Sequence, residues 1–496
     1  MNLLFLEDTK LQKMITYSLS TEYATEHFLH ITGTIETKNI EPVFLQLSAW
    51  RPGRYELGNF AKNIRSFSCQ DQNMKVLLYK KISKDCWQIF LNSDTKRIVF
   101  SYQYYANQLD AGACYINQEQ LYVNPVHCFM YEVGKIEEPI ELTLSIPEDY
   151  IIACQMPCVG KTLYASSYHC LADSPFIASN NIQHSTFNVQ NCKFHFWFQG
   201  KHELGIKRLQ SETEAYAKTQ IAIFNHLECK EYHFLYQMLP YPFRHGVEHS
   251  DSTVIAMGKG IDDTQEEFHN DLLAISSHEL FHLWNIKRIR PSEMWPYDYT
   301  KENYSTLGYV YEGVTTYYGD LLLLRSGVWD WEQYLSSLNS DLQKHYNNPG
   351  RFNYSVSESS YDTWLDGYLP GVPARKTSIY IEGLLSALIA DIMIIKNSNG
   401  KYCLDNVMHD LYHIFYLKNI GYNEDDYKLL LEKYAGISFD LFFNEIIWGK
   451  NFFEKYLEEL LPEIACCLVL GQNKIIKIVG NQEQENLFNH WVKRID

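Results

Sequence analysis

The sequence predicts an α+β protein with several domains, and three observations support this fold class. The chain has 496 residues, which is more than one hydrophobic core normally supports. From Ile15 to about residue 198, short segments alternate apolar and polar side chains. From Ser211 onward, apolar residues instead recur at three- and four-residue spacing. We therefore expect a β-rich first part and a helical second part.

The first part, residues 1–205, is predicted to be an antiparallel β-domain. Segments such as "HFLHITGTIET" and "RIVFSYQYYA" alternate with period two and are rich in β-branched and aromatic residues. Pro, Gly, Asn and Asp separate these segments, as is typical of turns between strands. So many short strands favour a β-sandwich or a saddle-shaped sheet.

Helical segments are predicted after a boundary at about residue 205. The stretch "SETEAYAKTQIAIFNHLE" has helical spacing, and the strand-like stretch "STVIAMG" interrupts the helical pattern. We expect one domain at 206–330 and a helical domain at 331–450, with turn-rich loops at "YNNPGRFNYS" and "LDGYLPGVPARKTS". The segment 451–496 is predicted to hold one or two strands and a short helix.

Composition excludes several classes of function. The net charge of −17 argues against binding to nucleic acid, whose phosphates need a basic surface. The chain has no run of about 18 apolar residues, so we expect no membrane span. The first residues, "MNLLFLEDTKLQK", lack the long apolar stretch of a secretory signal. The 12 cysteines are scattered without a CxxC pair, so we expect reduced thiols and a cytoplasmic location.

The stretch "HELFH" is the first candidate for chemistry. His278 and His282 are four residues apart, so in a helix they lie on one face and can bind one ion. Glu279 is placed to act as a general base on water. The alternative is an ordinary amphipathic helix, and a catalytic zinc site needs a third protein ligand. The helix is expected to continue to Arg290, with its basic residues complementing the helix dipole, and to stop at Pro291.

Glu312 is the candidate third ligand. It lies in the apolar helical segment "YVYEGVTTYYGDLLLLRSG", where an unpaired carboxylate is costly. Gly313, which follows it, lets a neighbouring helix approach closely. The alternative is a glutamate near a helix start that complements the helix dipole. Asp320, about two turns later, is predicted to orient a ligand histidine, although a surface aspartate has the same pattern.

These segments together resemble a known family. "HELFHLWNIKRIRP" followed by "EGVTTYYGDLLLLRSG" is similar to the glycyl aminopeptidase family of zinc metallopeptidases, which belongs with the thermolysin-like gluzincins. "LQLSAWRPGRYELGNFAKNIRSF" resembles the β-domain of that family, so the similarity extends from about residue 10 to about residue 450. The resemblance implies an N-terminal β-domain, a thermolysin-like catalytic domain, a helical domain that closes over the cleft, and one Zn²⁺ per chain.

The resemblance also implies roles for residues outside the zinc motif. "RHGVEHSDST" is similar to a segment at the edge of the family's cleft, which places Gly246 and Glu248 at the substrate. Glu248 then meets the free α-amine of a peptide, whereas without the resemblance it is assigned to a surface loop. "TSIYIEGLLSALIAD" implies that Tyr380 donates its hydroxyl to the oxyanion; a tyrosine packed at a helix start is the alternative. Glu382 replaces a lysine and His245 replaces a glycine of the family pattern.

The residues and the resemblance together predict a zinc-dependent aminopeptidase. It hydrolyses the first peptide bond of peptides with a free N-terminus, and the resemblance implies a preference for a small first residue, Gly or Ala. The alternatives are a catalytically silent peptide-binding protein, which the intact Glu279 disfavours, and a zinc endopeptidase, which Glu248 disfavours. The family usually continues into a PDZ domain, which we expect to be absent or reduced to a fragment in residues 451–496. The sequence makes no prediction of the oligomeric state.

Overall fold

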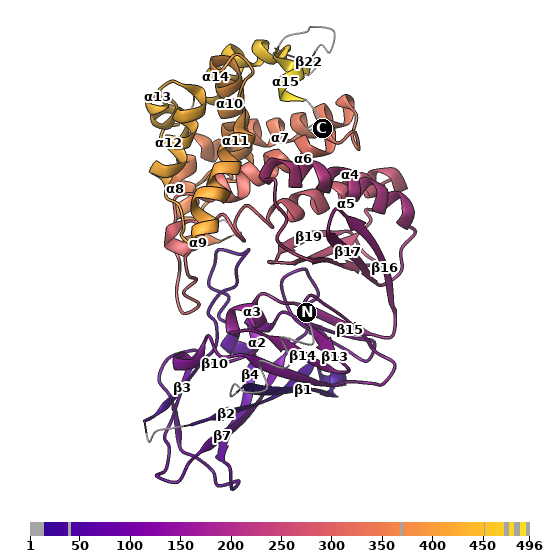
Figure 1. Ribbon diagram of the computed structural model, residues 1–496, viewed down its shortest axis with the longest axis vertical. Coiled ribbons are helices and arrows are strands. Elements are labelled where there is room, and N and C mark those ends of the chain that lie inside the picture. Colours follow the sequence, from indigo (N-terminus) through magenta and orange to yellow (C-terminus); the bar gives the residue numbers. More distant parts are fainter. Residues whose placement is uncertain are drawn as a thin grey trace.

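The structure is a computed structural model that describes residues 14–37, 41–367, 371–450, 452–470, 476–480 and 487–492. Figure 1 shows the N-terminal sheets at one end of the molecule, the C-terminal helices at the other, and a further sheet with its helices between them. The predicted α+β fold class is confirmed.

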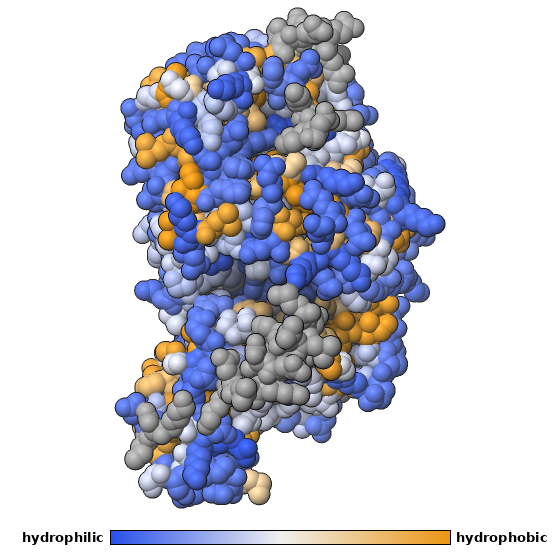
Figure 2. All heavy atoms as spheres, in the orientation of Figure 1, coloured by the Kyte–Doolittle hydropathy of each residue, from blue (hydrophilic) through white to orange (hydrophobic). Residues whose placement is uncertain are grey.

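Hydrophilic residues cover most of the face in Figure 2, with smaller hydrophobic areas among them. Within the described ranges, none of the helices has the length and apolar character that a membrane crossing requires.

The N-terminal part contains a seven-stranded sheet in the order β13-β14-β11-β1-β2-β7-β4. Neighbouring strands pair antiparallel except β1 and β11, which are parallel. In β2, buried and partly buried residues alternate, which is the period predicted from the sequence. The strands are β1 Ile15–Tyr23, β2 Phe28–Glu36, β4 Ile64–Asp71, β7 Arg97–Tyr105, β11 Ile140–Ser145, β13 Cys158–Val159 and β14 Thr162–Ala165.

Two four-stranded sheets complete the N-terminal part. Their orders are β10-β3-β6-β5 and β12-β15-β9-β8, with antiparallel pairing throughout. The strands are β3 Val43–Gln46, β5 Tyr79–Lys81, β6 Cys86–Ile89, β8 Tyr115–Ile116, β9 Gln120–Val123, β10 Tyr131–Glu132, β12 Ile151–Cys154 and β15 Phe176–Ser179. Short helical segments connect them: η1 Ala24–Glu26, η2 Phe60–Asn63, α2 Pro125–Cys128, η3 Val133–Lys135 and α3 Tyr168–Ala172.

A five-stranded sheet in the order β16-β17-β18-β20-β19 lies at the centre of the molecule (Figure 1). Helix α4 (Ile206–Phe224) connects the parallel strands β17 and β18. The prediction placed residues 182–199 in the N-terminal domain, but β17 pairs with β18 across the predicted boundary at 205. Strand periodicity cannot show which sheet a strand joins, because all the sheets share period two. The strands are β16 Ile182–Val189, β17 Cys192–Gln199, β18 Glu231–Met238, β19 Phe243–Glu248 and β20 Ser252–Gly258.

Helix α5 (Gln265–Phe281) packs on this sheet and carries the histidine motif. It begins with a capping box in which each of Thr264 and Glu267 accepts, with its side chain, a hydrogen bond from the backbone N–H of the other. Two backbone N–H groups that have no partner within the helix are thereby satisfied. The prediction that this helix continues to Arg290 was wrong. Ile286 has a φ of 95°, which a right-handed helix does not accommodate, so the basic residues lie in a turn beyond the helix end.

The helices after α5 form the end of the molecule opposite the N-terminal sheets (Figure 1). The π-helix η5 (Tyr309–Val314) leads directly into α6 (Thr315–Arg325). The other helices up to residue 450 are η4 Ser292–Met294, α7 Trp331–Asn347, η6 Pro349–Phe352, α8 Val356–Tyr361, α9 Thr363–Asp366, α10 Ile381–Asn397, α11 Leu404–Asp410, η7 Leu411–Phe415, η8 Tyr416–Lys418, α12 Glu424–Ala435, α13 Asp440–Phe442 and η9 Phe443–Ile447.

The C-terminal segment packs against the helices. Trp491 is fully buried, and its indole Nε1 donates to the hydroxyl of Tyr317 at 2.8 Å. Asn339 donates from Nδ2 to the Ile478 carbonyl at 2.9 Å. These contacts attach the end of the described chain to α6 and α7. The elements of this segment are α14 Phe453–Leu460, η10 Leu461–Ile464, β21 Cys466–Leu470, β22 Ile476–Gly480 and α15 Phe488–Trp491.

A buried ion pair joins the N-terminal sheets to the central part of the molecule. Lys287, in the turn after α5, donates from Nζ to Asp173 Oδ1 at 2.7 Å. His249 lies 3.1 Å from the same oxygen, and the backbone N–H of Ser250 donates to Oδ2 at 2.9 Å. Burial alone raises the pKa of Asp173, but Lys287 and His249 outweigh it, so the pKa of this carboxyl falls well below its usual value. Asp173 is therefore ionised at neutral pH and holds the two parts together.

We predict that Asp173→Asn lowers the free energy of unfolding by about 3–5 kcal/mol at pH 7, because it leaves the buried Lys287 ammonium without a counter-charge. A carboxyl whose pKa is depressed by folding contributes stability above its unfolded pKa of about 3.9, and loses it as the pH falls through the folded value. Urea denaturation at a series of pH values should show that the difference in unfolding free energy between the native protein and Asp173→Asn narrows below about pH 4. The exposed Asp94→Asn serves as the control. Equal stabilities at pH 7 would contradict the prediction.

Candidate active site

The candidate site residues predicted from the sequence line one cavity of about 690 Å³. They come from β19, α5, η5, α6 and the start of α10, so the central sheet and the helices both contribute to its wall. All the predicted site residues line this cavity: Gly246, Glu248, His278, Glu279, His282, Glu312, Asp320 and Tyr380. Residues separated by more than a hundred positions in the sequence therefore meet in one place.

The two motif histidines and Glu312 form a compact set of donors. The Nε2 atoms of His278 and His282 are 3.0 Å apart. Glu312 Oε2 lies 3.4 Å from His282 Nε2 and 3.9 Å from His278 Nε2. Donors around a tetrahedral zinc ion, at bond lengths of about 2.0–2.1 Å, stand about 3.3 Å apart. The three distances fit that arrangement, and two imidazoles with one carboxylate are a donor set that zinc prefers.

The hydrogen bond of His282 leaves the correct nitrogen available for a metal. His282 Nδ1 lies 2.9 Å from the backbone carbonyl of Asn285. A carbonyl only accepts, so Nδ1 carries the proton and the lone pair is on Nε2, which faces His278 and Glu312. The turn that follows α5 therefore fixes the ring in the tautomer that binds a metal ion.

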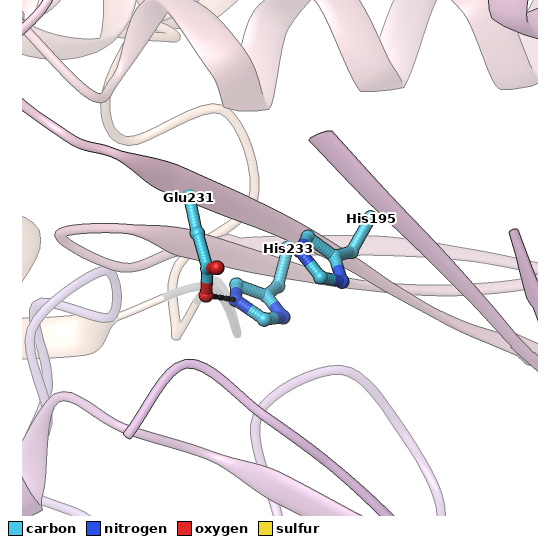
Figure 3. Close-up of side chains that lie close together, drawn as sticks. All are labelled: His195, Glu231 and His233. Carbon is cyan, nitrogen blue, oxygen red and sulfur yellow. Dashed lines mark ion pairs between the residues drawn. The ribbon is translucent and has the colours of Figure 1, made fainter. Parts of the chain in front are cut away.

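A second cluster of potential metal ligands lacks a free lone pair on the histidine nitrogen that faces the carboxylate. Figure 3 shows Glu231 beside the His233 ring and His195 on the neighbouring strand. The indole Nε1 of Trp197, which can only donate, gives its hydrogen to His233 Nδ1 at 3.1 Å. The neutral His233 ring therefore carries its own proton on Nε2, the atom that faces Glu231 at 3.9 Å. That nitrogen has no lone pair for zinc, so the cluster of His278, His282 and Glu312 fits a zinc ion better than this one does.

Glu279 occupies a position that only a glycine opposite it permits. A Cβ atom at Gly246 would lie 2.1 Å from Glu279 Oε1, so the missing side chain on β19 makes room for this carboxylate. Glu279 is buried, and its Oε2 has no hydrogen-bond partner among the described residues. Burial, reinforced by the nearby Glu248 and Glu312 carboxylates, raises the pKa of Glu279 to about 8.

Glu248 closes the same cavity from the edge strand β19. Only 4% of this residue is exposed, and its buried Oε1 has no hydrogen-bond partner in the described part of the chain. A turn of the N-terminal domain reaches it: Gly53 has a φ of 80°, and a Cβ there would lie 2.6 Å from Glu248 Oε2. In the same turn, the ring of Tyr55 packs 4.8 Å from that of Tyr311, next to Glu312. The prediction missed this turn, whose only signal in the sequence is a Pro-Gly pair.

Asp320 lines the cavity but does not have the predicted role. Its Oδ2 accepts a hydrogen bond from the Ser337 hydroxyl at 2.5 Å, so it contacts α7. The nitrogen of His282 that faces away from the donor cluster is held by the Asn285 carbonyl instead. Among the described residues, no hydrogen bond joins Asp320 to His278 or His282. Burial raises the pKa of Asp320 to about 6.

The start of α10 places Tyr380 beside the donor cluster. Its hydroxyl hydrogen-bonds the Glu312 carboxylate. The predicted close approach at Gly313 is confirmed, because a Cβ there would lie 2.3 Å from the Cα of Gly383 on α10. Glu382, which departs from the family pattern, does not line the cavity; its Oε2 lies 2.7 Å from the buried Nδ1 of His345.

His245, the other departure, does line the cavity. It precedes Gly246 on β19, and its Nδ1 lies 3.9 Å from Asp110 Oδ1 of the N-terminal part. Burial lowers the pKa of His245 to about 4, and the nearby Arg51 acts in the same direction. His245 is therefore neutral at neutral pH, so it adds a polar group but no charge to this wall of the cavity.

Comparison with protein families identifies the chain. Residues 16–180 match the model of the peptidase M61 N-terminal domain, and residues 271–386 match the model of the M61 glycyl aminopeptidases. The chain belongs to the M61 glycyl aminopeptidase family. The protein is therefore a metallo-aminopeptidase of a zinc-dependent family, and the M61 match at 271–386 includes the histidine motif, Glu312 and Tyr380.

Solved structures extend the similarity beyond the matched domains. An aminopeptidase N family protein from Idiomarina loihiensis is 28% identical, with a TM-score of 0.86 over 95% of this chain and 82% of that one. An M1 zinc metallopeptidase from Deinococcus radiodurans, solved as a mutant bound to a Tyr-Ser-Ala substrate, is 12% identical, with a TM-score of 0.55 over 89% of this chain and 94% of that one. The M1 likeness shows the fold alone. No curated protein sequence matches this chain significantly.

We predict that Gly246→Ala lowers the peptidase activity of this M61 protein by about 100-fold or more, because the added methyl group displaces the Glu279 carboxylate and misplacement of a reacting group by about 1 Å has this effect. Zinc content and melting temperature should stay close to those of the native protein, since neither the donor cluster nor the core changes. Gly134→Ala is the matched control, because its nearest atom to the added Cβ is 3.9 Å away. Full activity in Gly246→Ala would refute this role for the glycine.

Proposed function

We propose that this protein is a zinc-dependent aminopeptidase that hydrolyses the first peptide bond of peptides with a free N-terminus. One zinc ion per chain is held by His278, His282 and Glu312, whose spacing and tautomer fit it. Membership of the M61 family supports the class of reaction. The proposal adds the ligand set, the stoichiometry and the roles of the individual residues.

The observation that carries the exopeptidase assignment is a pair of buried carboxylate oxygens without partners. Glu248 Oε1 and Glu279 Oε2 are both buried and have no hydrogen-bond partner in the described structure. Ligand atoms of Glu248, Glu279 and His282 lie within 4.8 Å of one another. An isolated buried carboxylate is costly, and a substrate ammonium at Glu248 supplies the missing charge and hydrogen-bond donors. A blocked N-terminus leaves Glu248 unsatisfied, which explains selection for a free amine.

Glu279, Tyr380 and Glu248 have separate roles in the proposed reaction. When bound, zinc polarises the scissile carbonyl and lowers the pKa of a coordinated water. Glu279 accepts a proton from the attacking water and delivers it to the leaving amine. The Tyr380 hydroxyl, which hydrogen-bonds Glu312 before substrate binds, donates to the oxyanion that forms on the carbonyl oxygen. Glu248 fixes the amino end so that only the first peptide bond reaches these groups.

We also propose that the first residue of the substrate is small, Gly or Ala. Gly53 packs against Glu248, and Tyr55 packs against Tyr311 beside Glu312, so the N-terminal turn closes the wall next to the carboxylate that takes the amine. A wall closed by this turn supports a preference for a small first side chain. The family's description as glycyl aminopeptidases supports the same preference.

We predict that glycyl and alanyl aryl amides are cleaved and that N-acetylated analogues are not. Glu279→Gln should lower kcat by about 100- to 10,000-fold, since general acid–base catalysis contributes that much. Glu267→Gln is a matched control: it lies on the same helix and lines the same cavity, and a glutamine preserves the capping box. A protein that holds one zinc and cleaves none of these substrates would leave a binding role. Cleavage of the acetylated analogues would favour an endopeptidase.

We predict that Glu248→Gln raises KM for free-amine substrates and lowers kcat/KM by about 100-fold, because the charge-assisted hydrogen bond to the ammonium is lost. The preference for a free over an acetylated N-terminus should shrink by a similar factor. Bound zinc, measured by atomic absorption, should be unchanged, since Glu248 is not among the three ligands. An equal loss on both kinds of substrate would instead indicate a general distortion of the site.

A further inference from the structure

A second cavity, of about 380 Å³, lies in the N-terminal part of the molecule. The turn beside Glu248 separates this second cavity from the catalytic cavity. Gly53 lines the catalytic cavity, whereas Arg51 and Arg54, which flank Gly53, line the second cavity. The proposed aminopeptidase reaction does not use this second cavity.

Arg51 is the unusual group in this cavity. Only 4% of the residue is exposed, and no ion pair joins it to a carboxylate among the described residues. Its Nη1 donates a hydrogen bond to the carbonyl of the adjacent Pro52 at 3.2 Å. The guanidinium lies against Gly112, where a Cβ would be 2.1 Å from Nη2. A buried cation without a counter-charge is costly, so this arrangement favours an anionic ligand.

Other donors surround Arg51. Lys62 is exposed at the rim of the cavity. His127 is 7% exposed, stacks on Phe60 with ring centroids 3.8 Å apart, and has a buried Nε2 without a hydrogen-bond partner among the described residues. Burial lowers the pKa of His127, and the nearby Arg51, Arg54 and Lys62 lower it further. The three cations are therefore close enough to His127 to act on it together, and the ring stays neutral.

The two carboxylates in the cavity wall are already engaged. Glu56 forms an ion pair with Arg54. Asp110 accepts hydrogen bonds from the backbone N–H of Gly112 at 2.7 Å and from Gln108 Nε2 at 2.6 Å. Neither carboxylate lies within ion-pair distance of Arg51. The positive charge of Arg51 is therefore left for a group that enters the cavity.

We propose that this cavity is a binding site for a small oxyanion, with Arg51 as its central contact and Lys62 at its entrance. A guanidinium matches a carboxylate or a phosphate with two parallel hydrogen bonds. The anion has two sources, free inorganic phosphate and the terminal carboxylate of a short peptide; the second rests on the proposed peptidase function. Arg51 and Arg54 flank Gly53, which lies beside Glu248, so one turn of the chain forms part of the wall of both cavities.

The test is calorimetric titration of the zinc-loaded protein at constant ionic strength. The probes are inorganic phosphate, N-acetyl-trialanine with a free carboxylate, and the same peptide as its C-terminal amide. Acetylation keeps the peptide from the amine site at Glu248. Saturable binding of phosphate identifies the first source, and binding of the acid but not the amide identifies the second. No saturable binding of any probe overturns the proposal.

Variants locate the site. Arg51→Met should lower the affinity for the anion by about tenfold or more, because a charged donor is lost. Lys62→Met should lower the affinity by a smaller factor for the same reason. The exposed Arg97→Met, in the same domain, should bind as the native protein does. Glu248→Gln should also leave anion affinity unchanged, which separates this site from the catalytic cleft. If Arg51→Met fails to fold, Lys62→Met decides, because its side chain is exposed. Affinity that is unaffected by both Lys62→Met and Arg51→Met would overturn the proposal.

Discussion

The burial of several carboxylates around one point is the constraint on which the site depends. Glu248, Glu279 and Glu312 are all at most 6% exposed and surround His282. Burial lowers the pKa of His282, but Glu312 and its neighbours outweigh this effect and raise the pKa to about 10. The protein thus favours positive charge at this point. In the proposed site, a metal ion at Nε2 and a substrate ammonium at Glu248 would supply that charge without protonation of the ligand histidine.

The fold satisfies this constraint by bringing three parts of the chain into close contact. Glycines make the approaches possible, because a side chain at Gly53, Gly246 or Gly313 would overlap a carboxylate or the backbone of a neighbouring helix. The buried pair of Asp173 and Lys287 holds the N-terminal sheets against the turn that follows the histidine motif. The same turn contains the Asn285 carbonyl that selects the tautomer of His282. The stability of the fold and the proposed metal binding therefore depend on one short segment.

The sequence could predict the residues of this site better than their surroundings. The four-residue spacing of His278 and His282 implies one helical face, and an apolar helix around Glu312 implies a carboxylate that needs a partner. These arguments use local periodicity, which the sequence contains. The surroundings instead depend on long-range contacts that have no local signal. These are the approach of the Gly53 turn to Glu248, the hydrogen bond from Ser337 to Asp320 and the pairing of β17 with β18. The end of α5 was also misjudged, because tertiary contacts of Lys287 replace the expected helix-end role.

The most direct test of this account is a crystal structure of the zinc-loaded protein with anomalous diffraction measured on both sides of the zinc absorption edge. The account predicts one strong anomalous peak per chain, bound by Nε2 of His278, Nε2 of His282 and the carboxylate of Glu312. A peak at His195 and His233, or no peak between the α5 histidines in a protein that contains zinc, would contradict it.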